Sequence, residues 1–458
     1  MTRGSRAAPR PSSRGALRPA APASPMAVVD IDLAEPGAFR RPGGGARTRP
    51  SGRALGLVRF HGRPLGMAEA SGGEPEELWR ALAAAALRDF AGADEDVGLD
   101  EPHRTFVEAT AVSVIVATRN RTGMLRDCLD SLLELKYPRF EVIVVDNAPS
   151  DTSTEELVRR EYGGTRDDGG PLRNHSGTPD DGTRDDGGLL RNDGPAVRYL
   201  REPVPGLARA HNRGLAAAHG EIAAFTDDDT LVDPLWQTAL VAPFQADPRT
   251  GCVTGLIVPA ELDTEAQVAL ERHGAFGKGY AACTWSLRAP SADPLFPFTA
   301  GRFGSGANMA FRTELLRELG GFDPATGVGT PAHGGDDLLS FFRVLAHDRS
   351  LAYEPTAIVW HRHRRTPEAL EAQAFGYGAG FGAYLAGAIV HEPRMLPALL
   401  RRLPGGVRYA LARNRERAGP ATGRGAAASR LARLELRGML YGPYGYWRSR
   451  QIERRTGR

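Results

Sequence analysis

Three consecutive aspartates, Asp227, Asp228 and Asp229, directly follow a short apolar run in the segment AAFTDDDTLVDP (223–234). Adjacent like charges repel, and a carboxylate near an apolar interior is costly unless it is paired or coordinates a metal. The run is therefore either a solvated turn or a place where a cation binds. Divalent cations such as Mg²⁺ prefer carboxylate oxygens and typically bind one or two of them together with substrate phosphates. The Asp-x-Asp spacing of Asp227 and Asp229 suits this chemistry.

The segments upstream predict the strands and helix that begin the domain. VSVIVATRN (112–120) has the continuous apolar stretch of a parallel strand covered on both faces. GMLRDCLDSLLEL (123–135) has the spacing of an amphipathic helix. FEVIVVDNAPSD (140–151) is a second strand that ends in polar residues, among them Asp146 and Asp151. This order predicts an α/β sheet of the nucleotide-binding type, with ligands beyond the carboxyl ends of its strands.

The aspartate run is expected at that same edge of the sheet. Residues 196–234 predict a strand, a turn, a helix and a further strand that ends at the aspartates. Acids that follow separate strands of one sheet converge on one crevice. We therefore expect Asp146 and Asp151 to lie near the run.

In their order, the motifs of residues 111–365 resemble those of the inverting family 2 glycosyltransferases, which have the GT-A fold. VSVIVATRNR is similar to the opening strand of that family, with Ala117 and Arg119 where Pro and Tyr are usual. VIVVDNAPSD resembles the second strand, whose aspartate, here Asp146, binds the nucleoside. The resemblance implies a mixed, mainly parallel sheet flanked by helices.

Two further motifs extend the resemblance to the donor and acceptor sides. GLARAHNRGL (206–215) is similar to the Ala-Arg-Asn-x-Gly segment, with His211 in place of Arg and Asn212 retained. GSGANMAFRTELLRELGGFDP (304–324) resembles the acceptor-side segment. The resemblance assigns the donor nucleotide-sugar to Thr118, Arg119, Asp146, Asn212, Asp227 and Asp228.

The resemblance also implies the catalytic base. HGGDDLLSFFRVL (333–345) resembles the Glu-Asp motif that opens a helix of the family, with Asp336 in place of Glu. Asp337 aligns with the general base. Both aspartates could instead be first-turn acids that complement the helix dipole, a position compatible with catalysis.

A divalent cation, Mn²⁺ or Mg²⁺, is the expected cofactor. FTDDDT matches the metal motif, which gives the metal to Asp229 and a nucleotide or metal role to Asp227. AIVWHRHRR (357–365) resembles the strand end whose histidine completes the metal shell. His361 is the closer match and His363 the alternative, and we expect only one of them to point into the site.

Composition predicts the flanking regions. We expect a disordered Arg/Pro-rich tail over 1–53, a hairpin-plus-helix unit over 54–110 and the GT-A domain over 111–365. Within that domain 163–195, which repeats TRDDGG(P/L)LRN, is expected to be a flexible insertion. A helical, Arg-rich C-terminal extension is expected over 366–458.

The C-terminal extension leaves two interpretations open. The segment FGYGAGFGAYLAGAIV (375–390) is either an amphipathic hairpin at a membrane interface or a helix packed on the catalytic domain. No segment approaches the roughly 18 apolar residues of a membrane span. The cysteines Cys128, Cys252 and Cys283 have no metal-binding spacing and fit a reducing compartment. The expected location is the cytoplasm, with peripheral contact at the inner face of the membrane as a further option.

The sequence thus predicts an inverting glycosyltransferase in cell-surface polysaccharide or glycoconjugate synthesis. Its partners would be a nucleotide-sugar and an acceptor that is lipid-linked, a glycan or a small molecule, with no nucleic acid expected. One alternative is a nucleotidyltransferase, although VIVATRNRTGML lacks the usual Gly-rich phosphate loop. The other is a non-catalytic protein that binds polyanions through its Arg-rich ends.

Overall fold

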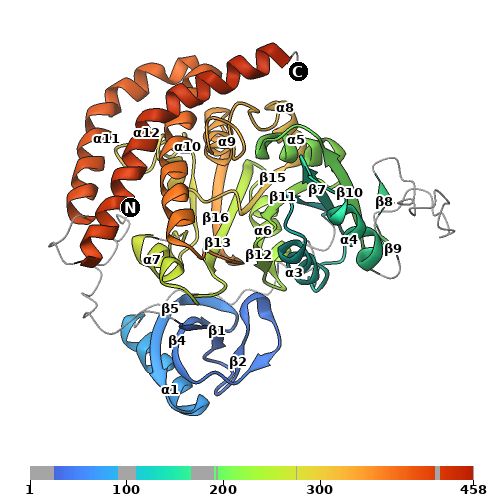
Figure 1. Cartoon of the computed structure of the whole chain (residues 1–458), viewed down its shortest axis with the longest axis vertical. Coiled ribbons are helices and arrows are strands. Elements are labelled where there is room, and N and C mark those ends of the chain that lie inside the picture. Colours follow the sequence, from blue (N-terminus) through green and yellow to red (C-terminus); the bar gives the residue numbers. More distant parts are fainter. Residues whose placement is uncertain are drawn as a thin grey trace, which may run out of the picture.

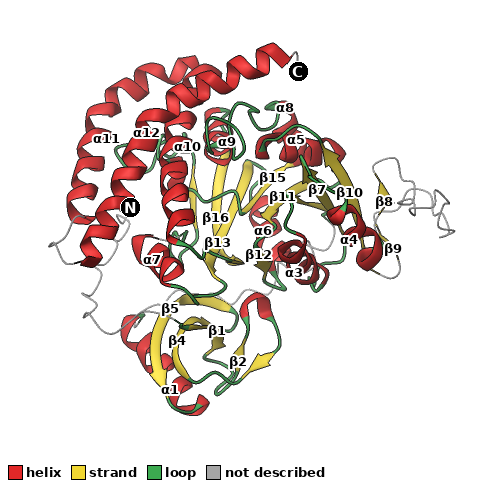
Figure 2. Cartoon of the chain, in the orientation of Figure 1, coloured by secondary structure: helices red, strands yellow, loops and turns green. Residues whose placement is uncertain are grey.

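The structure is a computed structural model in which a large mixed sheet forms the centre (Figures 1 and 2). It describes residues 25–90, 110–163, 165–166, 190–191, 194–274, 276–417 and 423–456. Most of the predicted insertion at 163–195 therefore lies outside the described residues, as do residues 1–24.

Among the described residues the central sheet has 11 strands in the order β12-β16-β13-β15-β11-β6-β7-β10-β8, with β14 beside β16 and β9 beside β10. The strands are β6 (Val112–Thr118), β7 (Phe140–Asn147), β8 (Thr165–Arg166), β9 (Leu190–Arg191), β10 (Gly194–Glu202), β11 (Ile222–Asp227), β12 (Thr230–Val232), β13 (Thr250–Pro259), β14 (Cys283–Trp285), β15 (Asn308–Arg312) and β16 (Ser350–His361). The pairs β6–β7, β7–β10, β6–β11 and β13–β16 are parallel, whereas β15 runs antiparallel to β11 and β13. The expected mixed, mainly parallel sheet is confirmed.

Helices cover both faces of this sheet, as the continuous apolar strands predict. These are α3 (Thr122–Leu133), α4 (Ser153–Tyr162), α5 (Leu207–Ala217), α6 (Trp236–Ala246), α7 (Glu265–Gly274), α8 (Thr313–Glu318) and α9 (Asp336–Ala346). Val114 of β6 packs in one core with Leu129 of α3 and Trp236 of α6. The next residue, Ile115, packs in the opposite core with Leu215 of α5. Successive side chains of a strand point to opposite faces, so both layers are anchored by the same strands.

The N-terminal region is more extensive than the sequence indicated. It is a five-stranded sheet in the order β3-β2-β1-β4-β5 with one helix against it. The elements are β1 (Ala27–Asp32), β2 (Phe39–Arg40), η1 (Pro42–Gly44), β3 (Arg47–Thr48), β4 (Gly52–Phe60), β5 (Arg63–Gly72) and α1 (Pro75–Asp89). We call these residues, 25–90, the N-terminal unit. The predicted hairpin and helix are present as β4, β5 and α1.

The expectation of disorder over 1–53 is wrong for residues 25–53. The short apolar segment AVVDID forms β1, which pairs in parallel with β4 over six residues. Val29, Ile31 and Phe39 are buried against α1 and the hairpin. The sequence around AVVDID is rich in Arg, Pro and Gly, which is typical of disordered segments. The short apolar signal of this strand was therefore too weak to predict β1.

A buried arginine joins the N-terminal unit to the central domain. Arg59 of β4 donates from Nε to Oδ1 of Asp30 at 2.8 Å and from NH2 to Oδ2 of Asp233 at 2.6 Å. The arginine is only 8% exposed, and both carboxylates are buried. Beside it, Leu57 packs in one apolar cluster with Trp360 of β16. The N-terminal unit is thus fixed to β16 and to the residue that follows β12, the strand that begins directly after Asp227, Asp228 and Asp229.

The C-terminal extension is helical, as predicted. It consists of α10 (Pro367–His391), η5 (Pro393–Met395), α11 (Leu396–Arg417) and α12 (Gly423–Thr456). The interpretation of 375–390 as a membrane hairpin is wrong, because this stretch lies within α10, which packs against α9 and α12. A Cβ added at Gly378 would meet the Glu435 carbonyl oxygen, and one at Gly442 would meet that of Ala379. The small residues therefore allow close helix packing. None of the described helices is long and apolar enough to cross a bilayer.

We predict that Arg59→Ala will lower the free energy of unfolding by about 3–5 kcal/mol, because it leaves two buried carboxylates without a cation. Urea unfolding followed by circular dichroism measures this change. Arg53→Ala is the matched control, since its ion pair with Glu69 is partly exposed and should contribute about 1 kcal/mol or less. Equal losses in the two variants would contradict the proposed importance of the buried pair.

Candidate active site

The aspartate run forms a tight turn between β11 and β12. Asp227 is the last residue of β11, and β12 begins at Thr230. The hydroxyl of Thr230 donates to the Asp227 carbonyl oxygen at 2.7 Å and lies 2.8 Å from the Thr226 hydroxyl. Asp228 and Asp229 are buried although they lie in a turn. A solvated acidic turn, the simpler of the two initial interpretations, does not describe this arrangement.

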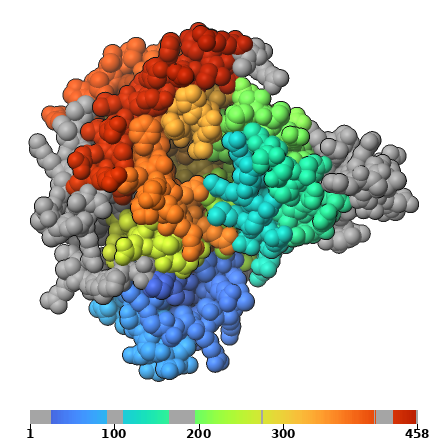
Figure 3. All heavy atoms as spheres, viewed as in Figure 1, coloured from blue at the N-terminus to red at the C-terminus, as the bar shows by residue number. Residues whose placement is uncertain are grey.

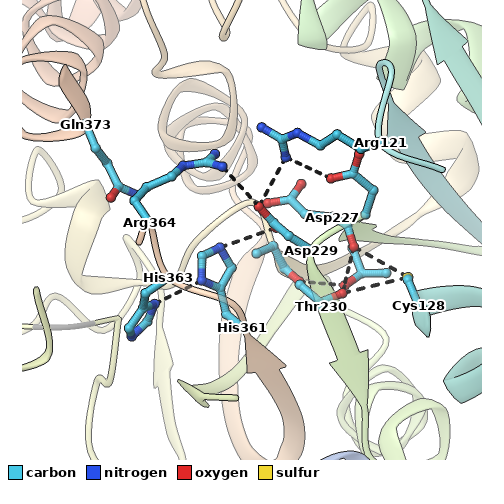
Figure 4. Close-up of polar contacts among 12 residues, drawn as sticks. Arg121, Cys128, Asp227, Asp229, Thr230, His361, His363, Arg364 and Gln373 are labelled. Atoms are coloured by element: carbon cyan, nitrogen blue, oxygen red, sulfur yellow. Dashed lines mark hydrogen bonds and ion pairs between the residues drawn. The ribbon is translucent and has the colours of Figure 1, made fainter. Parts of the chain in front are cut away.

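Asp227 and Asp229 lie beside His361, which comes from a distant part of the chain (Figure 4). Because β12 pairs antiparallel with β16, Thr230 lies opposite His361 in the sheet. One ligand atom from each of Asp227, Asp229 and His361 lies within 4.8 Å of the others. We call these three residues the acidic triad. The donor set of two carboxylates and one imidazole fits a divalent cation.

The imidazole of His361 is held by a chain of polar contacts. Its Nε2 lies 3.4 Å from Oδ1 of Asp229, and its Nδ1 lies 3.1 Å from Nδ1 of His363. His363 in turn places Nε2 3.0 Å from Oε2 of Glu271 on α7. Of the two histidines, only His361 belongs to the acidic triad. The other, His363, lies behind it.

The series of contacts from Glu271 through His363 to His361 favours the tautomer of His361 in which Nε2 carries no proton and can bind a metal. A carboxylate only accepts hydrogen bonds, so Glu271 selects a proton on Nε2 of His363. In the arrangement where Nδ1 of His363 accepts from Nδ1–H of His361, Nε2 of His361 is unprotonated and faces Asp229. Burial lowers the pKa of His361 to about 4, so its ring is neutral at physiological pH. A lone pair facing a carboxylate calls for a cation between them. Glu271 is a residue that the sequence patterns did not single out.

Two arginines face the acidic triad from opposite sides (Figure 4). Arg121 NH1 lies 3.0 Å from Oδ1 of Asp228 and 3.2 Å from Oδ2 of Asp229. Arg364 NH1 lies 3.6 Å from that same Oδ2 atom. Both side chains are partly exposed, so both could also reach a bound phosphate. Arg364 was missed by the motif analysis, although it stands one residue after His363 in the quoted strand end.

The three aspartates of the run differ in their surroundings. Asp228 accepts from the Thr118 hydroxyl at 2.7 Å, and its pKa is raised by burial and by the charge of Asp229. It faces Thr118 and Arg121, and is not part of the triad. The pKa of Asp227 is raised well above its usual range by burial and by the charges of Asp229, Asp228 and Asp336. Such repulsion is relieved when a cation binds.

Asp146 lies at the end of β7, directly across from Thr118 of β6. It is fully buried, and its Oδ2 accepts from the Tyr199 hydroxyl at 3.1 Å. Its Oδ1 has no hydrogen-bond partner among the described residues. Burial raises the pKa of this carboxyl to about 6. A buried carboxylate oxygen without a partner is costly, and such groups cluster where ligands bind. Asp151, by contrast, is on the exposed loop before α4 and accepts from the Ser153 amide.

Asp336 and Asp337 form the first turn of α9, as predicted. Asp337 is partly exposed, and its Oδ2 accepts from the Gly306 amide at 2.9 Å. Burial and the neighbouring Asp336 charge raise the pKa of Asp337 to about 6. Gly335 precedes the helix with φ 89°, and a Cβ there would collide with the Gly380 carbonyl oxygen of α10. The packing of α10 therefore fixes the position of the two acids.

Asp336 points into the protein interior. Its Oδ2 lies 3.4 Å from Nδ1 of His211, a fully buried ring between Phe225 and Phe322. His211 and Asp336 are both positions at which the sequence departs from the family motifs. The structure places these two departures against each other. Asp336 is thus a buried neighbour of Asp337 and is not exposed to a bound substrate.

The other two expected donor residues are not placed at the acids. Asn212 on α5 donates to the Phe322 carbonyl oxygen and accepts from the Phe322 amide, each at 2.8 Å. Its side-chain oxygen and nitrogen each bind the Phe322 backbone, so Asn212 holds that loop, and its expected contact with the donor stays a prediction. Arg119 is exposed on the loop after β6.

Comparison with known proteins finds a family that resembles part of this chain. The model of the family described as "Glycosyl transferase family 2" matches residues 113–165 and 177–320. This part of the chain is similar to glycosyltransferase family 2. The match favours a glycosyltransferase over the nucleotidyltransferase and polyanion-binding alternatives. Asp337 and His361 lie beyond the matched residues, so their place in the site rests on the structure.

Similar proteins include a pre-mycofactocin glycosyltransferase of Mycobacterium tuberculosis, 30% identical over 196 residues, which are 43% of this chain and 37% of the relative. A poly-beta-1,6-N-acetyl-D-glucosamine synthase of Staphylococcus epidermidis is 22% identical over 260 residues, with 55% and 50% covered. The chain therefore spans half or less of the length of these relatives. A solved mannosyltransferase from Pyrobaculum calidifontis, in complex with GDP-Man and Mn²⁺, is 20% identical with a TM-score of 0.40, covering 73% of this chain and 87% of its own.

We predict that Asp146→Asn will stabilise the ligand-free protein. Because the folded-state pKa of Asp146 lies above its ordinary 3.8, the ionised form opposes folding. The gain should reach up to about 3 kcal/mol above pH 6 and disappear as the pH falls towards 4. Denaturant unfolding between pH 4 and about pH 8 measures this change in the free energy of unfolding. Asn is the suitable substitution because its side-chain oxygen can still accept from the Tyr199 hydroxyl.

Glu141→Gln, on the same strand, is the control of opposite sign. Its pKa is lowered by hydrogen bonds from Ser113, the His219 amide and Arg198, which outweigh the effect of burial. Its charge therefore stabilises the fold above pH 4.5 and the substitution should destabilise it. The assignment of Asp146 fails if both variants change stability in the same direction.

Proposed function

We propose that this chain transfers a sugar from a nucleotide-diphosphate sugar to an acceptor hydroxyl, with inversion and with a divalent cation. The observation that carries the proposal is that acids from three distant segments meet at one edge of the sheet. The charge of Asp336 raises the pKa of both Asp227 and Asp337, which supports a single site for the triad and the proposed base. The similarity of residues 113–165 and 177–320 to family 2 supports the reaction class.

The acidic triad would hold the cation through Asp227, Asp229 and the Nε2 atom of His361. When bound, a divalent cation stabilises negative charge on a departing diphosphate. Arg121 and Arg364 pair with the carboxylates in the ligand-free protein. When the donor binds, they would turn towards its phosphates, because the cation then neutralises the carboxylates. Their charges then act on the same leaving group from two sides.

Asp146 would bind the nucleoside part of the donor. Its free Oδ1 atom lacks a donor group, and a ribose hydroxyl or a base N–H supplies one. Tyr199 holds the other oxygen and fixes the orientation of the carboxylate. Thr118, paired with Asp146 across the strands, links this position to Asp228.

Asp337 would accept the proton of the acceptor hydroxyl. The Gly306 amide holds its Oδ2 atom, and a pKa of about 6 keeps it ionised yet basic near neutral pH. The activated oxygen then displaces the diphosphate from the opposite side of the sugar carbon. A single displacement inverts that carbon, and no covalent enzyme intermediate forms.

We predict that Asp337→Asn will lower turnover by about 10²–10⁴-fold while donor binding stays within about twofold. Thermal shifts with UDP-glucose, UDP-N-acetylglucosamine and GDP-mannose in Mn²⁺ identify the donor, and release of its nucleoside diphosphate measures turnover. Asp348→Asn, an exposed aspartate paired with Arg288, is the control and should keep full activity. Unchanged turnover of Asp337→Asn would remove it as the base.

We predict that Mn²⁺ binding, measured by isothermal titration calorimetry without nucleotide, will be lost in Asp229→Asn. Glu271→Gln should weaken it by about 10–100-fold, because the chain that orients His361 is broken at its far end. Glu265→Gln, an exposed acid on the same helix, is the matched control and should bind Mn²⁺ normally. Equal affinity in the two α7 variants would show that Glu271 does not act on the metal site.

A further inference from the structure

We propose that the outward face of α12 binds the surface of a membrane that contains anionic lipids. This face, called the α12 face, combines a line of apolar side chains with a row of arginines. The apolar residues are Leu436, Leu440, Tyr444 and Trp447, and the arginines are Arg430, Arg433, Arg437, Arg448, Arg454 and Arg455.

The apolar line is unusually exposed for a helix that is packed against the protein. Leu440 is 76% exposed, Trp447 56%, Tyr444 49% and Leu436 37%. They are spaced by three or four residues and therefore share one side of the helix. The opposite side of α12 packs closely on α10 through Gly438 and Gly442. The line thus points away from the protein, where a continuous apolar patch indicates a binding partner.

The charges of this face have one sign. Between residues 430 and 455 all six exposed charged side chains are arginines, and no aspartate or glutamate is exposed. The acids in that stretch, Glu435 and Glu453, are partly buried, and Glu453 pairs with Arg209 of α5. Among the six arginines, Arg430 pairs with Glu371. The surplus of positive charge complements anionic lipid headgroups.

The combination of residues favours a membrane over other partners. Trp and Tyr are the residues that lie at headgroup depth, with aliphatic side chains below them and arginines reaching the phosphates. A symmetric pairing of two α12 faces would bring arginine against arginine, which like-charge repulsion opposes. A nucleic acid would satisfy the arginines but would leave Leu436 and Leu440 in water.

The position of α12 relates the proposed membrane contact to the candidate active site. Figure 3 shows α12 on the same side of the molecule as the hollow between α10 and α3. If the proposed function holds, which this step requires, a membrane-bound chain would have its active site near the lipid surface. The acceptor class that fits this arrangement is a lipid-linked hydroxyl. The membrane contact itself does not depend on that function.

Co-sedimentation of the full chain with vesicles tests the proposal. We expect binding to phosphatidylcholine vesicles containing phosphatidylglycerol to be at least about tenfold tighter than to pure phosphatidylcholine. The double variant Leu440→Ser/Trp447→Ser should lose at least about tenfold of this binding. Arg437→Gln/Arg448→Gln should lose the preference for anionic vesicles. Leu87→Ser, which removes a 64%-exposed leucine from α1, is the matched control and should bind as the wild type does.

Thermal shifts with the nucleotide-sugars, run on the same variants, separate this proposal from the proposed function. They should be unchanged, because α12 does not contribute to the acidic triad or to the base. Absence of wild-type vesicle binding would overturn the proposal, as would equal binding by the Leu440→Ser/Trp447→Ser variant. So would a dimer, seen by analytical ultracentrifugation, that dissociates in that variant, since the face would then be covered by a second copy.

Discussion

Mutual repulsion among carboxylates at the end of β11 is the constraint on which the rest of the site depends. Asp227, Asp228 and Asp229 lie where a buried strand meets the edge of the sheet, and their charges oppose one another. Arg121 and Arg364 offset part of this repulsion in the ligand-free protein. The arrangement is stable only because the surrounding sheet and helices hold it in place. That such a destabilising cluster is nevertheless buried supports the proposed role of these aspartates in binding a cation.

Much of the central domain could be predicted from local sequence. Continuous apolar segments such as 112–118 and 140–147 specify strands covered on both faces, and polar residues at their ends mark the ligand edge. Asp146 and the Asp227–Asp229 run could therefore be placed together without coordinates. The helix that begins at Asp336 was equally visible, because two acids precede an amphipathic stretch.

The remainder depends on contacts between distant segments, which local patterns do not report. Glu271 is an ordinary surface-type residue until the fold brings it to His363. Asn212 matched a motif, yet its amide is occupied by the Phe322 backbone. The strand at 27–32 is stable because it pairs with β4, and its own composition gives only a weak signal. The small residues of 375–390 left both a membrane hairpin and a packed helix open, and the structure shows that they permit contact with a helix some sixty residues further on.

The bond between Arg59 and Asp233 has a consequence for any attempt to isolate the catalytic domain. Asp233 directly follows β12, the strand whose pairing with β16 sets His361 opposite Thr230. In a chain cut to its family-matched portion, this aspartate would lose the arginine that pairs with it in the described structure. The loss of this ion pair would destabilise β12, the short strand that lies between the aspartate turn and Asp233. The N-terminal unit is therefore an integral support of the site, and the smallest autonomous folding unit is larger than the boundaries of sequence similarity imply.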